Sequence, residues 1–304
     1  MALRPIDNAL PISPDNPRLK KHAKVSIQTQ KRAPEVGLND ENKAPLSQPV
    51  DASVDYSASE NLKPFEDPES NIQRLVEGLD SKDWVTVCEL LNFVRRFAIY
   101  HSGLLLPILE KVMLVIVKAM KNPRSALCKT SIMAALDIFD AFGEKLLDST
   151  DSSAFDQLLL QLLLKASQDK KFVCEEADKS LTVLVNSIAP LPLLHRLHGF
   201  VNHGNLRVRA KAAVSISNSV SKMGSEEIGE FGLVLLLQMA SDLLNDRLPE
   251  AREAARSIVF SVYKAFTENE KSNPGEAWQS FCEKNLSTIQ AQSMIKVVSS
   301  SSSR

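Results

Sequence analysis

Basic side chains recur at five short turns of the chain, and their chemistry suits the binding of an acidic partner. The turns lie roughly 40 residues apart, a spacing within the range of helical repeats. A row of cationic groups raises the local concentration of an acidic partner and orients it. The candidate partner-binding residues are Lys82, Lys121, Arg124, Lys170, Lys171, Arg207 and Arg247.

Trp84 lies beside Lys82 and Asp83 in the first of these turns. An indole exposed at the end of a basic row is a suitable interface anchor, because Trp is enriched at the energetic centres of interfaces. The alternative is a Trp that folds down over its neighbouring helices, since Trp is usually well buried. Trp278, near the C-terminal end, is expected to be structural.

Three further arginines lie just inside helices that follow the turns. For Arg209, Arg252 and Arg256 we favour intramolecular pairs with acidic residues nearby, because surface charge pairs of this kind are common. We therefore leave them out of the candidate site.

Catalytic chemistry has no visible site. Only ten glycines occur, and none forms a GxGxxG or GxxxxGK phosphate-binding loop. We expect a protein that is not an enzyme and that needs no cofactor.

A metal site is not expected either. His195, His198 and His203 are the only clustered histidines, and no acidic residue or cysteine lies close enough in sequence to complete a ligand set. Cys88, Cys128 and Cys174 recur at similar depth in successive helices and are interpreted as small packing residues.

The turns must be positioned by a repeating unit of two helices. Apolar residues recur at helical spacing in each second helix, for example from Val87 to Ala98 and from Cys128 to Phe139. The first helices are more apolar and are expected at 104–120, 155–164, 192–201 and 231–244. Such a hairpin cannot bury its apolar face alone, so the pattern predicts an all-α solenoid of HEAT or armadillo type, with about six repeats.

Helix starts carry their own signals. Asp67 before Pro68, Asp83 before Trp84 and Asn122 before Pro123 each combine a capping side chain with a residue suited to the first helical turn. The last repeat is abbreviated, with helices expected near 274–284 and 286–297.

The sequence predicts three regions: a disordered tail at 1–64, the solenoid at 65–297 and a disordered Ser-rich end at 298–304. Residues 1–32 carry seven Lys or Arg against two acids, whereas 33–70 are mainly acidic. The start of the chain lacks the apolar core of a signal peptide, no apolar run is long enough for a bilayer, and the cysteines show no CxxC spacing. We expect a soluble protein of the cytoplasm.

The repeat region resembles a TOG domain, the HEAT-repeat module of microtubule regulators, and is most similar to the cytoplasmic linker-associated protein (CLASP) branch and its single-domain plant relatives. The resemblance rests on segments at the five turns, in their order and spacing. They are Leu79-Asp80-Ser81-Lys82-Asp83-Trp84, Asn122-Pro123-Arg124-Ser125, Asp169-Lys170-Lys171-Phe172-Val173, Asn205-Leu206-Arg207-Val208-Arg209 and Asn245-Asp246-Arg247-Leu248-Pro249-Glu250-Ala251-Arg252.

The resemblance implies binding of tubulin or microtubules through one edge of turns. Trp84 would be the anchor and the seven basic residues its support, which implies a protein of the microtubule cytoskeleton. Family members of this kind carry several such domains in tandem, whereas this chain has room for one, so polymerase activity based on a linked array is not expected.

Two other binding functions stay open. An armadillo-type adapter would grip a peptide on its second helices, although these show only Asn92 and Asn186 and no repeating Trp. A scaffold subunit of an enzyme complex would bind through the opposite turns. Nucleic acid is disfavoured, because acidic residues balance the positive charge outside the tail.

Overall fold

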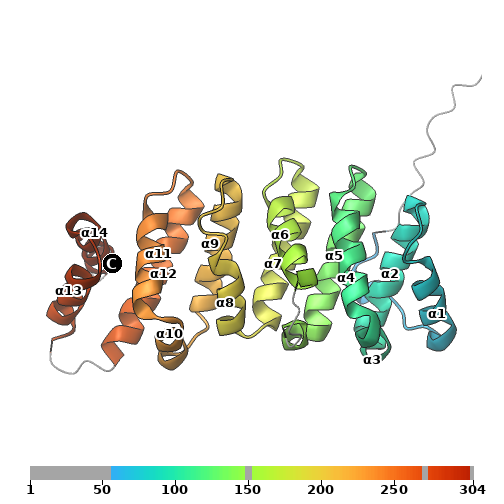
Figure 1. Ribbon diagram of the computed structural model, residues 1–304, viewed down its shortest axis with the longest axis horizontal. Helices are drawn as coiled ribbons and strands as arrows, with labels where there is room; N and C mark the ends of the chain where they lie inside the picture. The colour runs from blue at the N-terminus through green and yellow to red at the C-terminus, as the bar shows by residue number, and fades with distance from the viewer. Residues whose placement is uncertain (1–55, 148–152, 269–272, 302–304) are drawn as a thin grey trace, which may run out of the picture. The chain divides into compact units, whose positions relative to one another are not determined.

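The computed structural model describes residues 56–147, 153–268 and 273–301, all within the compact unit that spans Asp51–Arg304. These residues form helices and connecting turns, without strands (Figure 1). The α-helices are α1 (Pro68–Gly78), α2 (Trp84–Tyr100), α3 (Ser102–Leu105), α4 (Leu109–Lys121), α5 (Ser125–Phe142), α6 (Ser153–Ala166), α7 (Lys171–Ser187), α8 (Pro190–His198), α9 (Leu206–Val220), α10 (Ser225–Phe231), α11 (Leu233–Leu244), α12 (Pro249–Glu268), α13 (Pro274–Asn285) and α14 (Thr288–Ser301).

The helices pair into hairpins that stack in chain order. The pairs are α1 with α2, α4 with α5, α6 with α7, α8 with α9, α11 with α12 and α13 with α14. Second helices pack in succession, α2 on α5, α5 on α7, α7 on α9 and α9 on α12, while α4 packs on α6 (Figure 1). The predicted α-solenoid of about six helical repeats is therefore confirmed.

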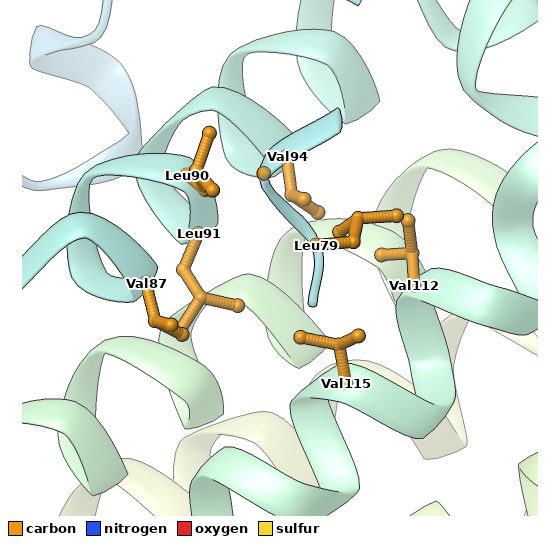
Figure 2. Close-up of a pocket in the computed structure, with 8 residues that line it drawn as sticks. Leu79, Val87, Leu90, Leu91, Val94, Val112 and Val115 are labelled. Carbon is orange, nitrogen blue, oxygen red and sulfur yellow. The ribbon is translucent and has the colours of Figure 1, made fainter. Parts of the chain in front are cut away.

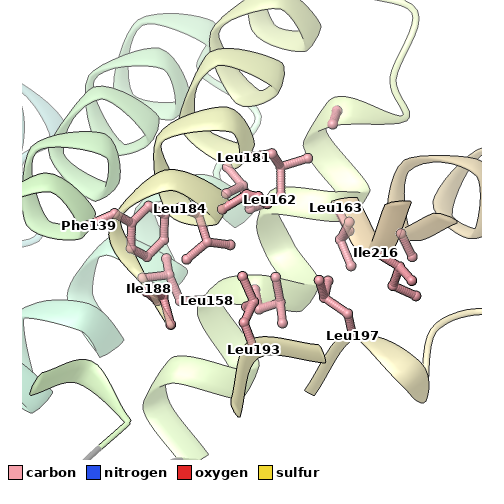
Figure 3. Close-up of a cluster of buried hydrophobic side chains, with 14 of the residues drawn as sticks. Phe139, Leu158, Leu162, Leu163, Leu181, Leu184, Ile188, Leu193, Leu197 and Ile216 are labelled. Carbon is pink, nitrogen blue, oxygen red and sulfur yellow. The ribbon is translucent and has the colours of Figure 1, made fainter. Parts of the chain in front are cut away.

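The core is shared between neighbouring hairpins rather than enclosed by any one of them. Figure 3 shows side chains of α5, α6, α7, α8 and α9 meeting in one cluster, with Phe139, Leu184 and Leu197 among them. None of these three side chains is measurably exposed to solvent. Removing a hairpin would uncover apolar area on both of its neighbours, which explains why the repeats must stack.

The interior of the first hairpins leaves no space for a ligand. Figure 2 shows a cavity between α1, α2 and α4 that is lined entirely by apolar side chains, including Leu91, Val94 and Val112. Its volume is about 10 Å³. A space of that size is at the limit for one water molecule, and its lining offers no hydrogen-bonding group.

Two of the three predicted helix starts are confirmed. The side chain of Asp67 accepts a hydrogen bond from the backbone N–H of Ser70, and Pro68 opens α1. The side chain of Asp83 accepts from the backbone N–H of Thr86 at 2.9 Å, and Trp84 is the first residue of α2. Both caps satisfy an N–H that has no partner within its helix.

The predicted start at Asn122 is wrong. Helix α5 begins at Ser125, and Asn122 closes the preceding helix α4 with an extended backbone. Its side-chain oxygen instead accepts from the backbone N–H of Arg124, two residues on, which forms a local turn. Asn122 thus closes α4, and Pro123 and Arg124 separate it from the start of α5.

Some of the expected first helices are interrupted or shifted. The helix predicted at 104–120 is divided, because Pro107 lies within a 3₁₀ segment, Leu106–Ile108, between α3 and α4. The helix predicted at 231–244 begins after Gly232, whose φ of +112° separates α10 from α11. Helix α8 starts at Pro190 rather than Pro192, since proline is tolerated in the first turn of a helix.

The ends of the folded region differ from the prediction. Residues 1–55 and 302–304 lie outside the described residues, whereas 56–64 are in place and include a 3₁₀ turn at Ser59–Asn61. Buried contacts with α2 and α5 hold this segment, as described below, so the folded region begins before residue 65. Helix α14 continues past Val297 to Ser301, with Val298 buried.

Among the described helices, none combines the length and the apolar character needed to cross a bilayer.

Candidate partner-binding edge

Contacts between neighbouring turns connect the predicted basic residues. We call the five turns the turn edge and define it by residues 81–84, 121–125, 167–172, 203–208 and 245–249, which link the first and second helices of five successive hairpins. Side chains within one turn reach groups of the next at the first three steps, and Arg209, just after the fourth turn, makes the fourth. The edge is therefore a continuous set of side chains, as the repeat pattern predicts.

The first contact joins Trp84 to the second turn. The guanidinium carbon of Arg124 lies 5.4 Å from the centroid of the Trp84 ring, within the range of a cation–π interaction. Trp84 is half-buried and packs against the core of the first hairpin. The indole is therefore partly buried. One part packs against the first hairpin, and the guanidinium of Arg124 lies over its ring.

Asp83 contributes charge at the same place. Hydrogen bonds from the backbone and side chain of Thr86 hold the pKa of the Asp83 carboxyl below its usual value, and the charge of Arg124 acts in the same direction. The carboxyl is therefore ionised at neutral pH. It caps α2 and lies near the cation that covers Trp84.

Two further contacts link the second, third and fourth turns. Lys170 donates to the hydroxyl of Ser125 at 3.0 Å, which joins the third turn to the second. Arg207 donates to the carboxylate of Asp169 and to the carbonyl oxygen of Ser167, which joins the fourth turn to the third. Both cations are exposed, so they hold their neighbours and still face solvent.

The arginines excluded from the candidate site behave as expected. Arg209 lies 3.0 Å from the carboxylate of Asp246 and joins the fourth turn to the fifth. Arg252 donates to the backbone carbonyl oxygens of Asp246 and Arg247, and Arg256 pairs with Glu253 on its own helix. The predicted pairing with acidic residues is confirmed for Arg209 and Arg256, whereas the intramolecular contacts of Arg252 are with backbone carbonyl oxygens.

The remaining predicted cations are exposed. Lys171 forms an ion pair with Glu175 at 3.7 Å on the surface of α7, a type of pair that contributes little energy. Lys82, Lys121 and Arg247 have no ion-pair partner within the described parts of the chain. Their charge is therefore free to attract a partner.

Phe172 was missed by sequence reasoning as a site residue. It follows Lys171 in the first turn of α7 and is 44% exposed, so the edge presents a second aromatic side chain. The signal was an aromatic residue directly after two lysines in a recurring turn. Because apolar residues at such positions commonly pack inward, the pattern alone could not show that this ring faces solvent.

The histidines and cysteines pack as structural residues. His195 and His198 lie against the ring of Phe231, with ring centroids 4.9 and 6.2 Å away. Cys88 and Cys128 are buried, and burial raises the pKa of both thiols. Within the described ranges, no three His, Cys, Asp or Glu side chains gather as a metal ion would require.

Cys174 is more exposed than its predicted packing role suggests, whereas Trp278 is buried as predicted. Cys174 is partly exposed rather than buried, and its thiol donates to the carbonyl oxygen of Ala166. Trp278 is 2% exposed and packs with Tyr263, Phe266 and Phe281, which confirms its structural role.

Comparison with known proteins gives one family and a related protein. The family model described as CLASP N terminal matches residues 100–281. Over 244 residues the chain is 28% identical to TOG array regulator of axonemal microtubules protein 1 of Mus musculus. The match covers 79% of this chain and 13% of the relative, so the chain spans a small part of the length of that protein.

Solved structures show the same fold at low sequence identity. A TOG domain of Zyg9 from C. elegans gives a TM-score of 0.58 at 14% identity, over 79% of this chain and 88% of that chain. The MAST/Orbit N-terminal domain gives a TM-score of 0.53 at 15% identity, over 80% of this chain and all of that chain.

Proposed function

Since the chain belongs to the CLASP N-terminal family, we propose that it is a tubulin- or microtubule-binding protein, without catalytic activity, that helps to organise the microtubule cytoskeleton. The related mouse protein is named as a regulator of axonemal microtubules. The observation that carries the proposal here is the turn edge, where Trp84 and a row of basic residues are joined by side-chain contacts from turn to turn.

The proposed mechanism divides the edge into two kinds of group. Lys82, Lys121 and Arg247 are exposed and have no ion-pair partner among the described residues, so they attract an acidic protein surface and orient it. Trp84 and Phe172 offer apolar area that a partner can cover. Burial of this area provides the part of the affinity that does not depend on charge.

Acidic residues within the turn edge reduce its net positive charge. Asp83 and Asp169 lie within the row and offset part of the positive charge of Arg124 and Arg207. Salt screens exposed charges, so attraction of the partner by Lys82, Lys121 and Arg247 should weaken as the salt concentration rises. The contacts made by the rings of Trp84 and Phe172 should persist.

The test is co-sedimentation with polymerised microtubules and size-exclusion binding to free tubulin, for the wild type and Trp84→Ala. We expect Trp84→Ala to weaken binding by about 2 kcal/mol, or roughly 30-fold in Kd, if Trp84 is the anchor. Ile289→Ala serves as the control, because Ile289 is 80% exposed on α14 and lies outside the turn edge.

The outcomes separate the parts of the proposal. Wild-type affinity in a folded Trp84→Ala protein would remove Trp84 from the site and leave tubulin binding in place. Absence of wild-type binding to both tubulin and microtubules would contradict the function itself. The adapter function would then be preferred, with its peptide in a hollow of about 320 Å³ on α7 and α9 that includes Asp178 and Lys211.

A further inference from the structure

The segment Tyr56–Phe65, which we call the strap, lies across α2 and is held along its length. The hydroxyl of Tyr100 donates to the carbonyl oxygen of Leu62 at 2.7 Å. The guanidinium of Arg96 donates to the carbonyl oxygens of Lys63 and Pro64, at 2.6 and 3.0 Å. These bonds use the backbone of the strap, so they fix its path.

An aromatic side chain fastens the C-terminal end of the strap. The ring of Phe65 is 8% exposed and lies 4.7 Å from the ring of Phe97 and 5.0 Å from that of Phe93, centroid to centroid. The guanidinium of Arg96 covers it at 3.6 Å. This end is anchored by apolar burial and by the guanidinium of Arg96.

The middle of the strap depends on a buried ion pair. Arg95 is fully buried and Asp137 is 3% exposed, and their side chains meet at 2.7 Å, joining α2 to α5. Ser59 donates its hydroxyl to the second carboxylate oxygen of Asp137 at 2.6 Å and accepts from Arg95 at 3.2 Å. Arg95 also donates to the carbonyl oxygen of Ser57. The hydroxyl of Ser59 is thus the side-chain link between the strap and the pair.

The charges around Asp137 cannot neutralise a second anion. The carboxylate of Asp137 is balanced by one guanidinium, and burial raises the pKa of its carboxyl against the opposing effects of Ser59 and Arg95. A phosphate on Ser59 would bring between one and two further negative charges to a hydroxyl that already touches Asp137. Like charges repel strongly beside a buried carboxylate that has one cationic partner, and the phosphate would be better hydrated away from it.

We propose that Ser59 is a phosphorylation site, and that phosphate on its hydroxyl oxygen releases the strap from α2 and α5. In the transfer, the Ser59 oxygen bonds to the γ-phosphorus of ATP, the bond from that phosphorus to the bridging oxygen breaks, and ADP leaves with the electron pair. A protein kinase takes up the hydroxyl proton. Glu60 and Asn61, next to the site, are exposed and Ser59 is partly exposed, so a kinase meets this part of the strap at the surface and reaches the hydroxyl once it leaves Asp137.

Release would uncover a defined surface. Phe93, Phe97 and Arg96 lose the cover of Phe65, while Arg95 and Asp137 keep each other but lose Ser57 and Ser59. The surface combines aromatic rings with a guanidinium and lies on α2, the helix that Trp84 begins. The proposal does not depend on tubulin binding.

The experiment is hydrogen exchange on the full chain with phosphoserine incorporated at position 59, compared with the unmodified chain. We expect the amides of residues 57–65 to exchange faster by about tenfold or more, while those of α12 stay unchanged. The matched control carries phosphoserine in place of Asn61, which is exposed in the same segment and makes no contact with the ion pair. This control should leave the strap protected.

A second variant separates release from general unfolding. Adding Asp137→Asn to the chain with phosphoserine 59 removes the repelling charge and should restore part of the protection. Unchanged or slower exchange of residues 57–65 with phosphoserine 59 would overturn the proposal. So would equal acceleration by phosphoserine 61, a uniform acceleration that includes α12, or the absence of any rescue by Asp137→Asn.

Discussion

Arg95 and Asp137 form a buried ion pair whose remaining hydrogen-bonding groups are used by the strap. Removing two charges from water is costly, and the attraction between them offsets that cost only when their other polar atoms are also satisfied. Here Arg95 donates to Asp137, Ser57, Ser59 and Asn92, while Asp137 accepts from both Arg95 and Ser59. The pair therefore depends on residues far apart in the sequence.

Removing one partner should be much worse than removing both. Arg95→Met leaves a buried carboxylate without its cation, and we expect a loss of about 3–5 kcal/mol in unfolding free energy, measured by urea denaturation. Arg95→Met combined with Asp137→Leu should recover most of that loss. A double variant as unstable as the single one would show that packing around the pair, rather than charge, is responsible.

Arg207 and Arg209 lie two residues apart but differ in burial, so their substitution should have different effects. Arg207 pairs with Asp169 in solvent, whereas Arg209 pairs with Asp246, whose side chain is 4% exposed. We expect Arg207→Gln to leave the melting temperature unchanged and to slow association with microtubules at low salt. Arg209→Gln, its matched control, should lower the melting temperature. A clear loss of stability in Arg207→Gln would contradict its assignment to partner binding.

The sequence predicted that the five turns would share one edge, but not which of their side chains would make contact. Trp84 could be placed because Asp83, its cap, is adjacent, and such local signals can be read from the chain. The contact of Lys170 with Ser125 joins residues 45 positions apart, and that of Arg207 with Asp169 joins residues 38 apart. The repeat pattern predicts that turns approach one another, but not which side chains will pair.

Helix boundaries could be predicted from the sequence only where a residue has a single structural role. Asp67 and Asp83 each stand in a loop directly before a helix and were predicted correctly, whereas Asn122 directly follows α4, so it closes that helix and its side chain forms a turn with Arg124 instead of a cap. Gly232 divides an apolar stretch that reads as one helix, because glycine inside such a pattern is compatible with either a break or a continuation.

Gly143 ends α5 in a conformation that other residues rarely adopt. Its φ is +43°, and a side-chain carbon at this position would lie 2.5 Å from the backbone oxygen of Ser187, at the end of α7. We expect Gly143→Ala to cost about 2 kcal/mol or more of stability.

The control for this prediction is Gly229→Ala, in helix α10, where an added carbon meets no atom within 4 Å. That change should be neutral or stabilising by up to about 1 kcal/mol, because alanine favours the helix more than glycine does. Thermal unfolding followed by circular dichroism compares the two. Equal stability of both variants would show that the end of α7 can move to relieve the contact.

At the scale of the molecule, the sequence predicted the stacked hairpins but placed the start of the folded region too late. Hairpins repeat an apolar pattern, and each packs on its neighbours in sequence, so their arrangement can be inferred locally. The strap has two serines, charged residues at Glu60 and Lys63, and a single buried aromatic ring. Its order comes from acceptor groups that match Arg95, Arg96 and Tyr100 on another element, which composition cannot reveal.

The folded region also extends beyond the residues that match the family model. A fragment of residues 100–281 would lack the strap, α1, α14, nearly all of α2 and the end of α13, exposing core positions that Leu91, Val94 and Phe97 cover on α4 and α5. We expect this fragment to lose cooperative thermal unfolding and to bind a hydrophobic dye, whereas residues 56–301 should unfold in one transition. A sharp transition in the shorter fragment at the same temperature would contradict this view.

The contacts from turn to turn along the edge also bear on the entropy of recognition. A long side chain that is immobilised only when a partner arrives loses rotamer freedom at that moment, which opposes binding by about 0.5–1.5 kcal/mol. Arg124 and Lys170 already rest on Trp84 and Ser125, so much of their freedom is lost when the chain folds. A partner therefore meets a surface close to its bound form, and association should need little rearrangement of the solenoid itself.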